Sequence, residues 1–205
     1  MIHALLTEKS SIKSIQKDNG GMKSSNIIIG TRVPYEYFIS QGSGESDFGY
    51  HPGAYDVALE KAGGVHNFNH ITYSSILPKT AVRIKSVPKN YPHGAVLESI
   101  TAEAGKGMIY PKRLTAGLII TKIFKNGDYI GGLVAEYGGT DSKQDCEKFL
   151  KANMENMVKR RFGEGVEMTD EVFVESIEPK SKYACAIIVL GFTSYKYPIL
   201  GVKKE

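Results

Sequence analysis

The dipeptide Asn126-Gly127 is the feature that most constrains the fold of this chain, because it joins two apolar segments of strand length. Asn and Gly both tolerate positive φ, which the two-residue turn of a β-hairpin requires. The flanking segments, TAGLIITKIF (115–124) and YIGGLVAEY (129–137), are therefore predicted to be antiparallel neighbours in one sheet. Other apolar runs predict strands at residues 26–33, 67–73, 95–103, 171–178 and 183–192.

Two segments have the pattern of helices, and a predicted loop precedes the first. The loop, SQGSGESDFGYHPG (40–53), is dense in glycine, serine and acidic residues. A short helix is predicted at residues 54–63, with Tyr55, Leu59 and Ala62 along one side and a pair of glycines at its end.

The second helix is predicted to begin after Ser142 and to run to about Phe162, where Gly163 ends it. Ser142 with Asp145 three residues later resembles a capping box, in which side chains bind the free N–H groups of the first turn. The apolar side of this helix is predicted to consist of Cys146, Phe149, Leu150, Met157 and Val158. Hairpin strands with two helices indicate an α+β fold, in which helices cover antiparallel sheet.

Length and composition favour one domain in a reducing compartment. A net charge of +4, from 26 basic and 22 acidic residues, is too balanced to indicate a nucleic-acid partner. Cys146 and Cys185 have no metal-ligand spacing, so no metal site is expected. No apolar run reaches the length of a membrane span, and we expect a cytoplasmic protein. Residues 1–25 are predicted to be a disordered or loosely attached extension of a domain at residues 26–205.

The serine pair Ser74-Ser75 interrupts an apolar stretch, NFNHITYSSILPK (67–79). A turn is one explanation. The other is chemical: the second hydroxyl can attack the preceding carbonyl, shift the acyl group from nitrogen to oxygen, and allow β-elimination to cut the chain. The dehydroalanine that remains hydrolyses to a pyruvoyl group. This rearrangement needs a strained peptide, and Pro78 restricts its own backbone and that of Leu77. The residues permit the reaction without requiring it.

Five segments together resemble the pyruvoyl-dependent arginine decarboxylases, in the same order and over roughly residues 35–160. The most specific of them is Asn-x-x-x-x-Ser-Ser followed by Ile-Leu-Pro. The five segments are GSGESD (42–47), AYDVALEKAG (54–63), NFNHITYSSILPK (67–79), HGAVLE (93–98) and GGLVAEYGG (131–139).

The resemblance implies that the precursor cleaves itself between Ser74 and Ser75, giving a β chain of residues 1–74 and an α chain of residues 75–205. Ser75 would become the pyruvoyl cofactor, with no metal and no pyridoxal phosphate. The implied activity is a lyase that converts L-arginine to agmatine and carbon dioxide. The pyruvoyl ketone would form a Schiff base with the substrate amine and accept the electrons that decarboxylation releases.

Glu136 matches the proton-handling acid of that family. Alternation along YIGGLVAEY places Glu136 on the same face as Ile130 and Val134, and the opposite face is also partly apolar. A carboxyl group there is partly desolvated, so its pKa rises and it can reprotonate the substrate carbon near neutral pH. The alternative is a solvated strand end just before Gly138-Gly139.

Asp56 matches the acidic residue that contacts the substrate side chain, and a carboxylate can bind a guanidinium group through paired hydrogen bonds. The alternative is an aspartate in the first helical turn that stabilises the helix dipole. The loop acids Glu45 and Asp47 are further candidates for binding the cation. For at least one of these two, simple solvent exposure is expected.

Asn69 matches the asparagine that assists cleavage, because an amide can hold the oxyanion of the acyl shift. An ordinary polar position in a strand is the alternative. Phe68, beside it, is expected to help line the substrate pocket. His66 and His70 flank the same segment and are assigned no catalytic role.

The resemblance also implies a four-layer αββα sandwich with mainly antiparallel sheets. It implies a homotrimer or a dimer of trimers, with active sites at the subunit boundaries. Two alternatives stay open. The same chemistry could act on histidine, lysine or ornithine, because Asp56 alone does not separate these cations. An unprocessed homologue could instead serve a non-catalytic role, as a structural or regulatory subunit. The sequence leaves the pathway, polyamine biosynthesis or acid resistance, undetermined.

Overall fold

The structure, a computed structural model, describes residues 25–204. It divides into a larger unit, residues 32–196, and a smaller one to which both ends of the chain belong. In the smaller unit, β1 (Ser25–Ile29) pairs antiparallel with β11 (Ile199–Lys204), the C-terminal segment. The predicted extension lies outside the described residues, apart from Ser25.

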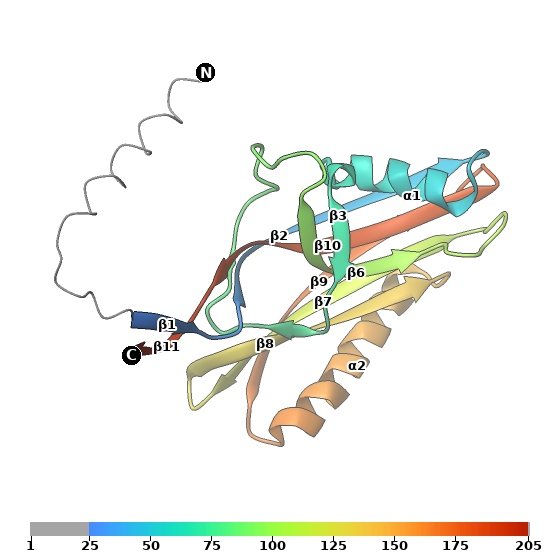
Figure 1. Ribbon diagram of the computed structural model, residues 1–205. Helices are drawn as coiled ribbons and strands as arrows, with labels where there is room; N and C mark the ends of the chain where they lie inside the picture. Colours follow the sequence, from blue (N-terminus) through green and yellow to red (C-terminus); the bar gives the residue numbers. More distant parts are fainter. Residues whose placement is uncertain (1–24, 205) are drawn as a thin grey trace, which may run out of the picture. The chain divides into compact units, whose positions relative to one another are not determined.

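The larger unit contains two sheets (Figure 1). One has five strands in the order β3-β6-β10-β2-β5, and the other has four in the order β4-β8-β7-β9. Only two of their pairings are parallel, β3 with β6 and β2 with β5. The strands are β2 (Val33–Ser46), β3 (Asn69–Thr72), β4 (Ile76–Leu77), β5 (Val82–Arg83), β6 (Val96–Ala104), β7 (Leu114–Lys125), β8 (Asp128–Gly139), β9 (Glu167–Ile177) and β10 (Tyr183–Lys196). The predicted α+β class with mainly antiparallel sheets is confirmed.

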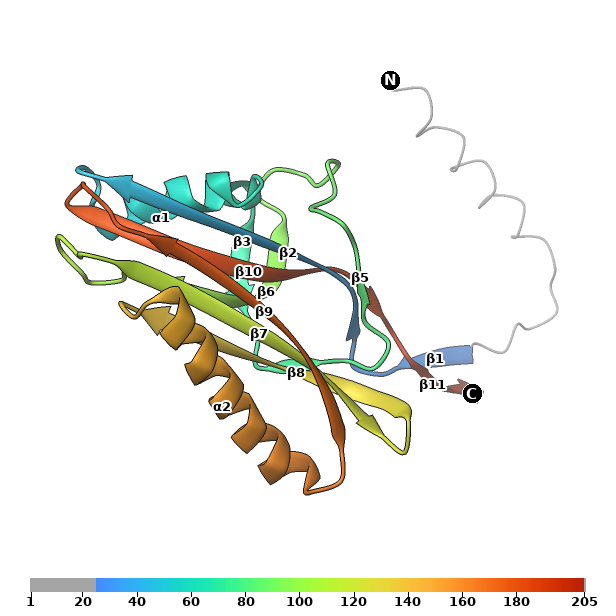
Figure 2. The ribbon, with the colours of Figure 1, turned by 180° about the vertical axis from the view of Figure 1, so that it is seen from behind.

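Each sheet carries one long helix. The helix α1 (Tyr50–Lys61) packs against β2 and β10, and the short η1 (Val65–Asn67) follows it. The helix α2 (Lys143–Phe162) packs against β7, β8 and β9, as the view from behind shows (Figure 2). No helix within residues 25–204 combines the length and the apolar character that crossing a membrane requires.

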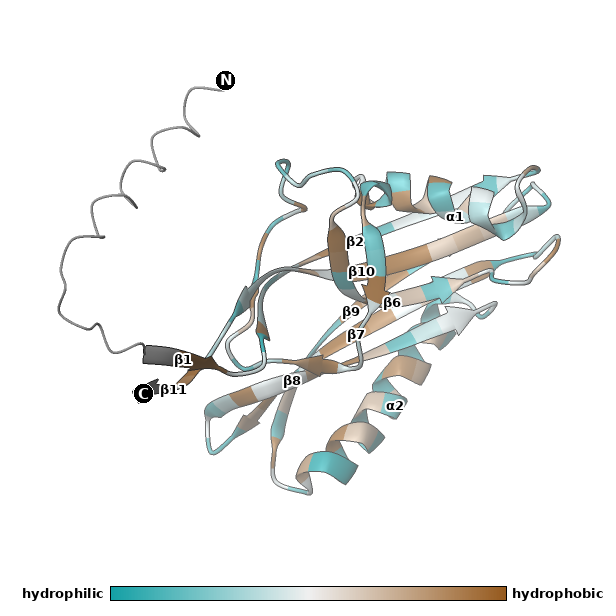
Figure 3. Cartoon of the chain, in the orientation of Figure 1, coloured by the Kyte–Doolittle hydropathy of each residue, from teal (hydrophilic) through white to brown (hydrophobic). Residues whose placement is uncertain are grey.

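Side chains of β10 alternate between two apolar clusters, and hydrophobic colours accordingly run along this strand (Figure 3). Ile188 and Leu190 join a cluster that includes residues of the four-stranded sheet, such as Val134. Ile187 and Val189 point the other way, into the cluster that α1 covers. A third cluster lies between the four-stranded sheet and α2, whose buried residues are Cys146, Leu150, Met154 and Val158.

The two strongest local predictions are confirmed. Asn126 and Gly127 have φ values of 52° and 80° and join β7 to β8 as a hairpin. Ser142 caps α2, since its side chain accepts a hydrogen bond from the N–H of Asp145 at 3.2 Å, and Gly163 follows the last turn. One part of the helix prediction is wrong: Phe149 is 51% exposed rather than buried.

The predicted loop at residues 40–53 is also wrong, because β2 continues to Ser46 and α1 begins at Tyr50. The glycines of this stretch serve close packing rather than a turn. A Cβ atom on Gly42 would lie 2.4 Å from the carbonyl oxygen of Ala58, and one on Gly44 would lie 2.6 Å from that of Ala54. Glycine thus allows α1 to lie directly on the strand.

Candidate active site

The Ser74–Ser75 peptide lies where the chain passes from one sheet to the other. β3 ends at Thr72 in the five-stranded sheet, and β4 begins at Ile76 in the four-stranded sheet. The carbonyl oxygen of Ser74 accepts a hydrogen bond from the N–H of Ile76 at 3.0 Å, which closes a three-residue turn centred on Ser75. The carbonyl that the Ser75 hydroxyl would attack is therefore already polarised by a backbone donor.

Backbone hydrogen bonds hold this crossing on both sides. The N–H of Tyr73 donates to the carbonyl oxygen of Ser99 in β6 at 2.7 Å. The N–H of Val134 in β8 donates to the carbonyl oxygen of Ser75 at 3.0 Å. Each sheet thus anchors one side of the serine pair, and the peptide between the two anchors has little freedom to relax.

Glu136 lies two residues beyond Val134 on β8, so both side chains project from the same face of the strand. Val134 belongs to the cluster between the two sheets, and Glu136 lies half-buried at its edge. Burial raises the pKa of Glu136, in the direction that the sequence predicted. The alternative of a fully solvated strand end does not describe this residue.

The predicted alignment of Ile130 with Glu136 is wrong. The pairing of β7 with β8 shifts register between Ile123 and Phe124, whose partners are Gly131 and Tyr129. Ile130 is the extra residue of this β-bulge. Its side chain packs with the cluster beneath α2 instead of the cluster between the sheets.

Asp56 lies in the second turn of α1, because the helix begins at Tyr50 rather than at residue 54. The first-turn explanation for this aspartate is therefore wrong. Asp56 is exposed, on a helix that covers the face of the five-stranded sheet opposite to the face that meets Val134. The structure consequently does not bring Asp56 next to Glu136 within one chain.

Phe68 and Asn69 lie at the start of β3. The ring of Phe68 packs against the cluster that α1 covers and lies 5.4 Å, centroid to centroid, from the ring of Tyr91. The amide nitrogen of Asn69 donates to the carbonyl oxygen of Gly94 at 2.8 Å. The length of β3 separates Asn69 from Thr72 by about 10 Å, so within one chain Asn69 lies away from the serine pair.

Glu45 and Asp47, at the end of β2, bind the connection between β9 and β10. Oε2 of Glu45 accepts hydrogen bonds from the N–H groups of Lys180 at 2.6 Å and Ser181 at 3.0 Å. These two hydrogen bonds lower the pKa of Glu45, and the bond from Ser181 has the larger effect. Oδ1 of Asp47 accepts from the N–H of Lys182 at 2.8 Å. Both carboxylates therefore have a structural task in the folded chain.

The sequence analysis missed a buried carboxylate beside the serine pair. Glu98 in β6 is 5% exposed and accepts a hydrogen bond from the hydroxyl of Tyr73 at 2.5 Å. Its other oxygen is paired with the guanidinium group of Arg32. Alternation offered a signal for Glu98, because it shares the face of β6 that carries Ile100 and Ala102, both buried between the sheets.

These features define a class of protein. A serine pair is held between two sheets, its carbonyl is bonded by a backbone N–H, and a desolvated carboxylic acid lies on the neighbouring strand. This combination is compatible with the self-processing, pyruvoyl-dependent decarboxylase that the resemblance in sequence implies.

Comparison with known proteins agrees. The family model described as pyruvoyl-dependent arginine decarboxylase matches residues 36–197. A relative from Chlamydia abortus, named pyruvoyl-dependent arginine decarboxylase AaxB, is 31% identical over 82% of this chain and 94% of its own length. A Methanopyrus kandleri protein named pyruvoyl-dependent arginine decarboxylase is 30% identical over 78% of this chain and 97% of its own length.

The chain belongs to the pyruvoyl-dependent arginine decarboxylase family. The match extends beyond the segments that carried the resemblance in the sequence, since it includes α2, β9 and β10. Family membership implies a pyruvoyl cofactor.

Proposed function

We propose that this protein cleaves itself between Ser74 and Ser75 and then decarboxylates L-arginine to agmatine and carbon dioxide. Family membership and the names of the relatives support the activity. The observation that carries the proposal is the hydrogen bond from the N–H of Ile76 to the carbonyl oxygen of Ser74. A donor at that oxygen stabilises the negative charge that develops there when a nucleophile attacks the carbonyl carbon.

In the cleavage step, Oγ of Ser75 bonds to the carbonyl carbon of Ser74 and the peptide C–N bond breaks, which leaves an ester and a free amine. Removal of the Cα proton of Ser75 then expels the carboxylate of Ser74 and leaves dehydroalanine. Water converts that residue to a pyruvoyl group and releases ammonia. The hydrogen bond from Val134 to the carbonyl oxygen of Ser75 would hold this residue in place through the changes.

The residues around Ser75 fit a pyruvoyl group formed there. Ser75 is half-buried and its carbonyl is bonded to β8, the strand that carries Glu136. When present, the group supplies a conjugated carbonyl that accepts the electrons released as carbon dioxide leaves. Glu136, whose pKa burial raises, keeps a proton at higher pH than an ordinary carboxyl group and donates it to the substrate carbon.

The substrate-binding residues are proposed to come from a neighbouring subunit. Asp56 would bind the guanidinium group and Phe68 would line the pocket, while Asn69 would assist cleavage by holding the oxyanion of the acyl shift. They lie on α1 and at the start of β3, apart from Ser75 within one chain. A trimer or dimer of trimers with sites at subunit boundaries would join the two groups. Glu45 and Asp47, which also bind backbone N–H groups of the β9–β10 connection, would be further acidic groups for the substrate cation.

The finer fold assignment belongs to the same proposal. The three apolar clusters lie under α1, between the sheets and under α2. We propose that they separate the layers of a four-layer αββα sandwich.

The proposal is tested with purified protein on a denaturing gel and by mass analysis. Fragments of residues 1–74 and 75–205 are expected, the second with an N-terminal pyruvoyl group that borohydride traps with substrate. Assays with arginine, lysine, ornithine and histidine then determine specificity. A single intact chain under all conditions would support the non-catalytic alternative. Faster decarboxylation of lysine, ornithine or histidine than of arginine would show that arginine is not the substrate.

A further inference from the structure

Glu98 is a buried carboxylate in a part of the molecule where charge is costly unless donors surround it. Its oxygens are bonded to the guanidinium group of Arg32 and the hydroxyl of Tyr73. The guanidinium carbon of Arg32 also lies 4.9 Å from the ring centroid of Tyr195. Burial, followed by the hydrogen bond to Glu98, raises the pKa of Tyr195. These side chains form a polar network in which the Glu98 side chain is buried and the Arg32 side chain is partly exposed.

This network reaches the serine pair through Tyr73, the residue immediately before Ser74. The backbone N–H of Tyr73 bonds to Ser99 and its hydroxyl bonds to Glu98, two consecutive residues of β6. Its ring also lies 5.6 Å from the ring of Phe192. The backbone, the ring and the hydroxyl group of Tyr73 are therefore all held in place. Tyr73 directly precedes Ser74, whose carbonyl is the one to be attacked.

We propose that Glu98 and Tyr73 are positioning residues for self-cleavage, which hold the Ser74 carbonyl in line with the Ser75 hydroxyl. The inference rests on the proposed function. Neither residue touches the reacting atoms. The effect comes through geometry, because an acyl shift between adjacent residues requires the peptide to be held in a conformation that a free chain rarely adopts.

The experiment follows the first-order rate of cleavage in freshly purified precursor by gel densitometry. Tyr73→Phe keeps the ring and loses the bond to Glu98, and cleavage is expected to slow roughly ten- to a hundredfold. Glu98→Gln should slow it similarly. Tyr137→Phe is the matched control, since it removes a hydroxyl bond to Asp141 on the other face of β8. It should cleave at the wild-type rate.

Two further measurements separate positioning from a general loss of structure. Decarboxylation per pyruvoyl group in the cleaved fraction of Tyr73→Phe should match wild type, and its unfolding midpoint should stay close to that of Tyr137→Phe. Wild-type rates of cleavage in both Tyr73→Phe and Glu98→Gln would overturn the inference and leave the proposed function intact. Failure of the wild type to cleave would instead contradict the proposed function.

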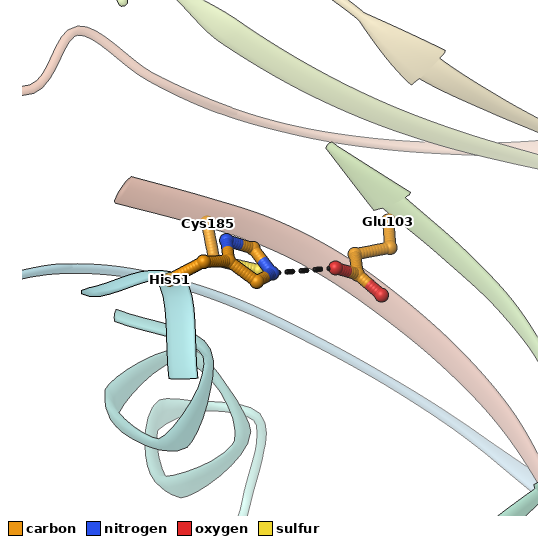
Figure 4. Close-up of side chains that lie close together, drawn as sticks. All are labelled: His51, Glu103 and Cys185. Carbon is orange, nitrogen blue, oxygen red and sulfur yellow. Dashed lines mark hydrogen bonds and ion pairs between the residues drawn. The ribbon is translucent and has the colours of Figure 1, made fainter. Parts of the chain in front are cut away.

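A second observation is independent of cleavage. His51, Glu103 and Cys185 come from α1, β6 and β10, and one ligand atom of each lies within 4.8 Å of the others (Figure 4). Nε2 of His51 is 2.7 Å from a carboxylate oxygen of Glu103. Nδ1 of His51 is buried and has no hydrogen-bond partner among residues 25–204. This cluster could not be predicted from the sequence, because its members are far apart along the chain.

The donor set has a defined chemical preference. Imidazole nitrogen, thiolate sulfur and carboxylate oxygen together suit a borderline divalent ion such as Zn²⁺ or Co²⁺. Four-coordinate zinc holds its ligand atoms roughly 3.3 to 3.7 Å apart, so the cluster needs only small adjustments. A cavity of about 230 Å³, lined by His51, Tyr55 and Glu103 among others, could supply a water as the fourth ligand.

We infer that His51, Glu103 and Cys185 form a binding site for one divalent transition-metal ion, which fastens the start of α1 to the five-stranded sheet. Metal binding would require the Cys185 thiol to lose its proton. Burial raises the pKa of that thiol in the metal-free chain, and a bound cation opposes this effect.

The probe is Co²⁺. Its binding is measured by the near-ultraviolet absorption of the thiolate-to-metal charge-transfer band and by equilibrium dialysis. Wild type should bind one equivalent with the thiolate band, and Zn²⁺ should displace it. Cys185→Ser should lose the band, and His51→Gln and Glu103→Gln should bind more than tenfold more weakly. Cys146→Ser, which alters the other buried cysteine, should bind as wild type does. If wild type shows no thiolate band, or if Cys185→Ser binds Co²⁺ as tightly as wild type does, the proposed metal site is wrong.

Discussion

The N–H of Ile76 donates a hydrogen bond to the carbonyl oxygen of Ser74, 3.0 Å away, across the residue that is proposed to attack that carbonyl. The two residues belong to opposite sides of the bond to be cut. Because Ile76 is fixed in β4 by pairing with Leu133, the donor cannot drift away as the carbonyl changes geometry. The same backbone that ends the turn can therefore stabilise the oxyanion.

Ser75→Ala should abolish self-cleavage, because no nucleophile remains next to the Ser74 carbonyl. A gel and mass analysis should find only the intact chain, and arginine decarboxylation should be lost. The matched control is Ser40→Ala, in β2, whose hydroxyl makes no hydrogen bond within the described part of the chain. Cleavage of Ser75→Ala at residue 74 would contradict the assignment.

Glu136→Gln should cleave normally and decarboxylate slowly. Loss of a positioned acid lowers kcat by roughly 10²- to 10⁴-fold. The measurement is carbon dioxide release per pyruvoyl group. Glu167→Gln provides the comparison, since Glu167 is an exposed acid at the start of β9 in the same sheet. A kcat for Glu136→Gln within twofold of wild type would exclude Glu136 as the proton donor.

The raised pKa of Glu136 also predicts how stability depends on pH. The unfolded chain ionises this group near pH 4.3, and the folded chain does so only at higher pH. Unfolding therefore releases a proton in that interval, and wild type loses stability relative to Glu136→Gln as the pH rises through it. The difference should be constant below the interval and again above it. Urea titrations at several pH values measure it, and a flat difference would contradict the burial effect.

Asp56→Asn should raise the KM for arginine and leave self-cleavage unchanged. The loss of a charge-assisted hydrogen bond costs about 1.5–3 kcal/mol, which corresponds to roughly a ten- to hundredfold increase. Glu60→Gln lies one turn further along α1 and is also exposed, so it controls for charge on the helix. Equal KM values for the two variants would exclude Asp56 from the substrate site.

Gly42→Ala should destabilise the fold, because the new Cβ would lie 2.4 Å from the carbonyl oxygen of Ala58 and push α1 off β2. Overpacking of this kind costs about 1–3 kcal/mol in the free energy of unfolding. Gly201→Ala, a strand glycine with nothing within 4 Å of the added atom, should be nearly neutral. Denaturant unfolding of both variants gives the comparison.

The sequence by itself determined the features that depend on neighbours along the chain. Asn126-Gly127 specified the hairpin because its two residues adopt positive φ, and Ser142 specified the start of α2 because its side chain binds an N–H three residues away. Five short segments in order, of which the one with Ser74-Ser75 is the most specific, likewise identified the family and the bond proposed for cleavage.

Only the tertiary structure decided what depends on distant contacts. The sequence predicts Gly42 in a loop, whereas in the structure it is a strand residue against which α1 packs closely. The sequence predicts Ile130 on the same face as Glu136, whereas the β-bulge opposite β7 turns Ile130 to the other face. The bond between Glu98 and Tyr73 arises because β3 pairs with β6, and the separation of Asp56 from Ser75 arises because a sheet lies between α1 and β8. Local backbone preference acts over a few residues, whereas burial and pairing follow from which strands meet, and the chain order does not fix that.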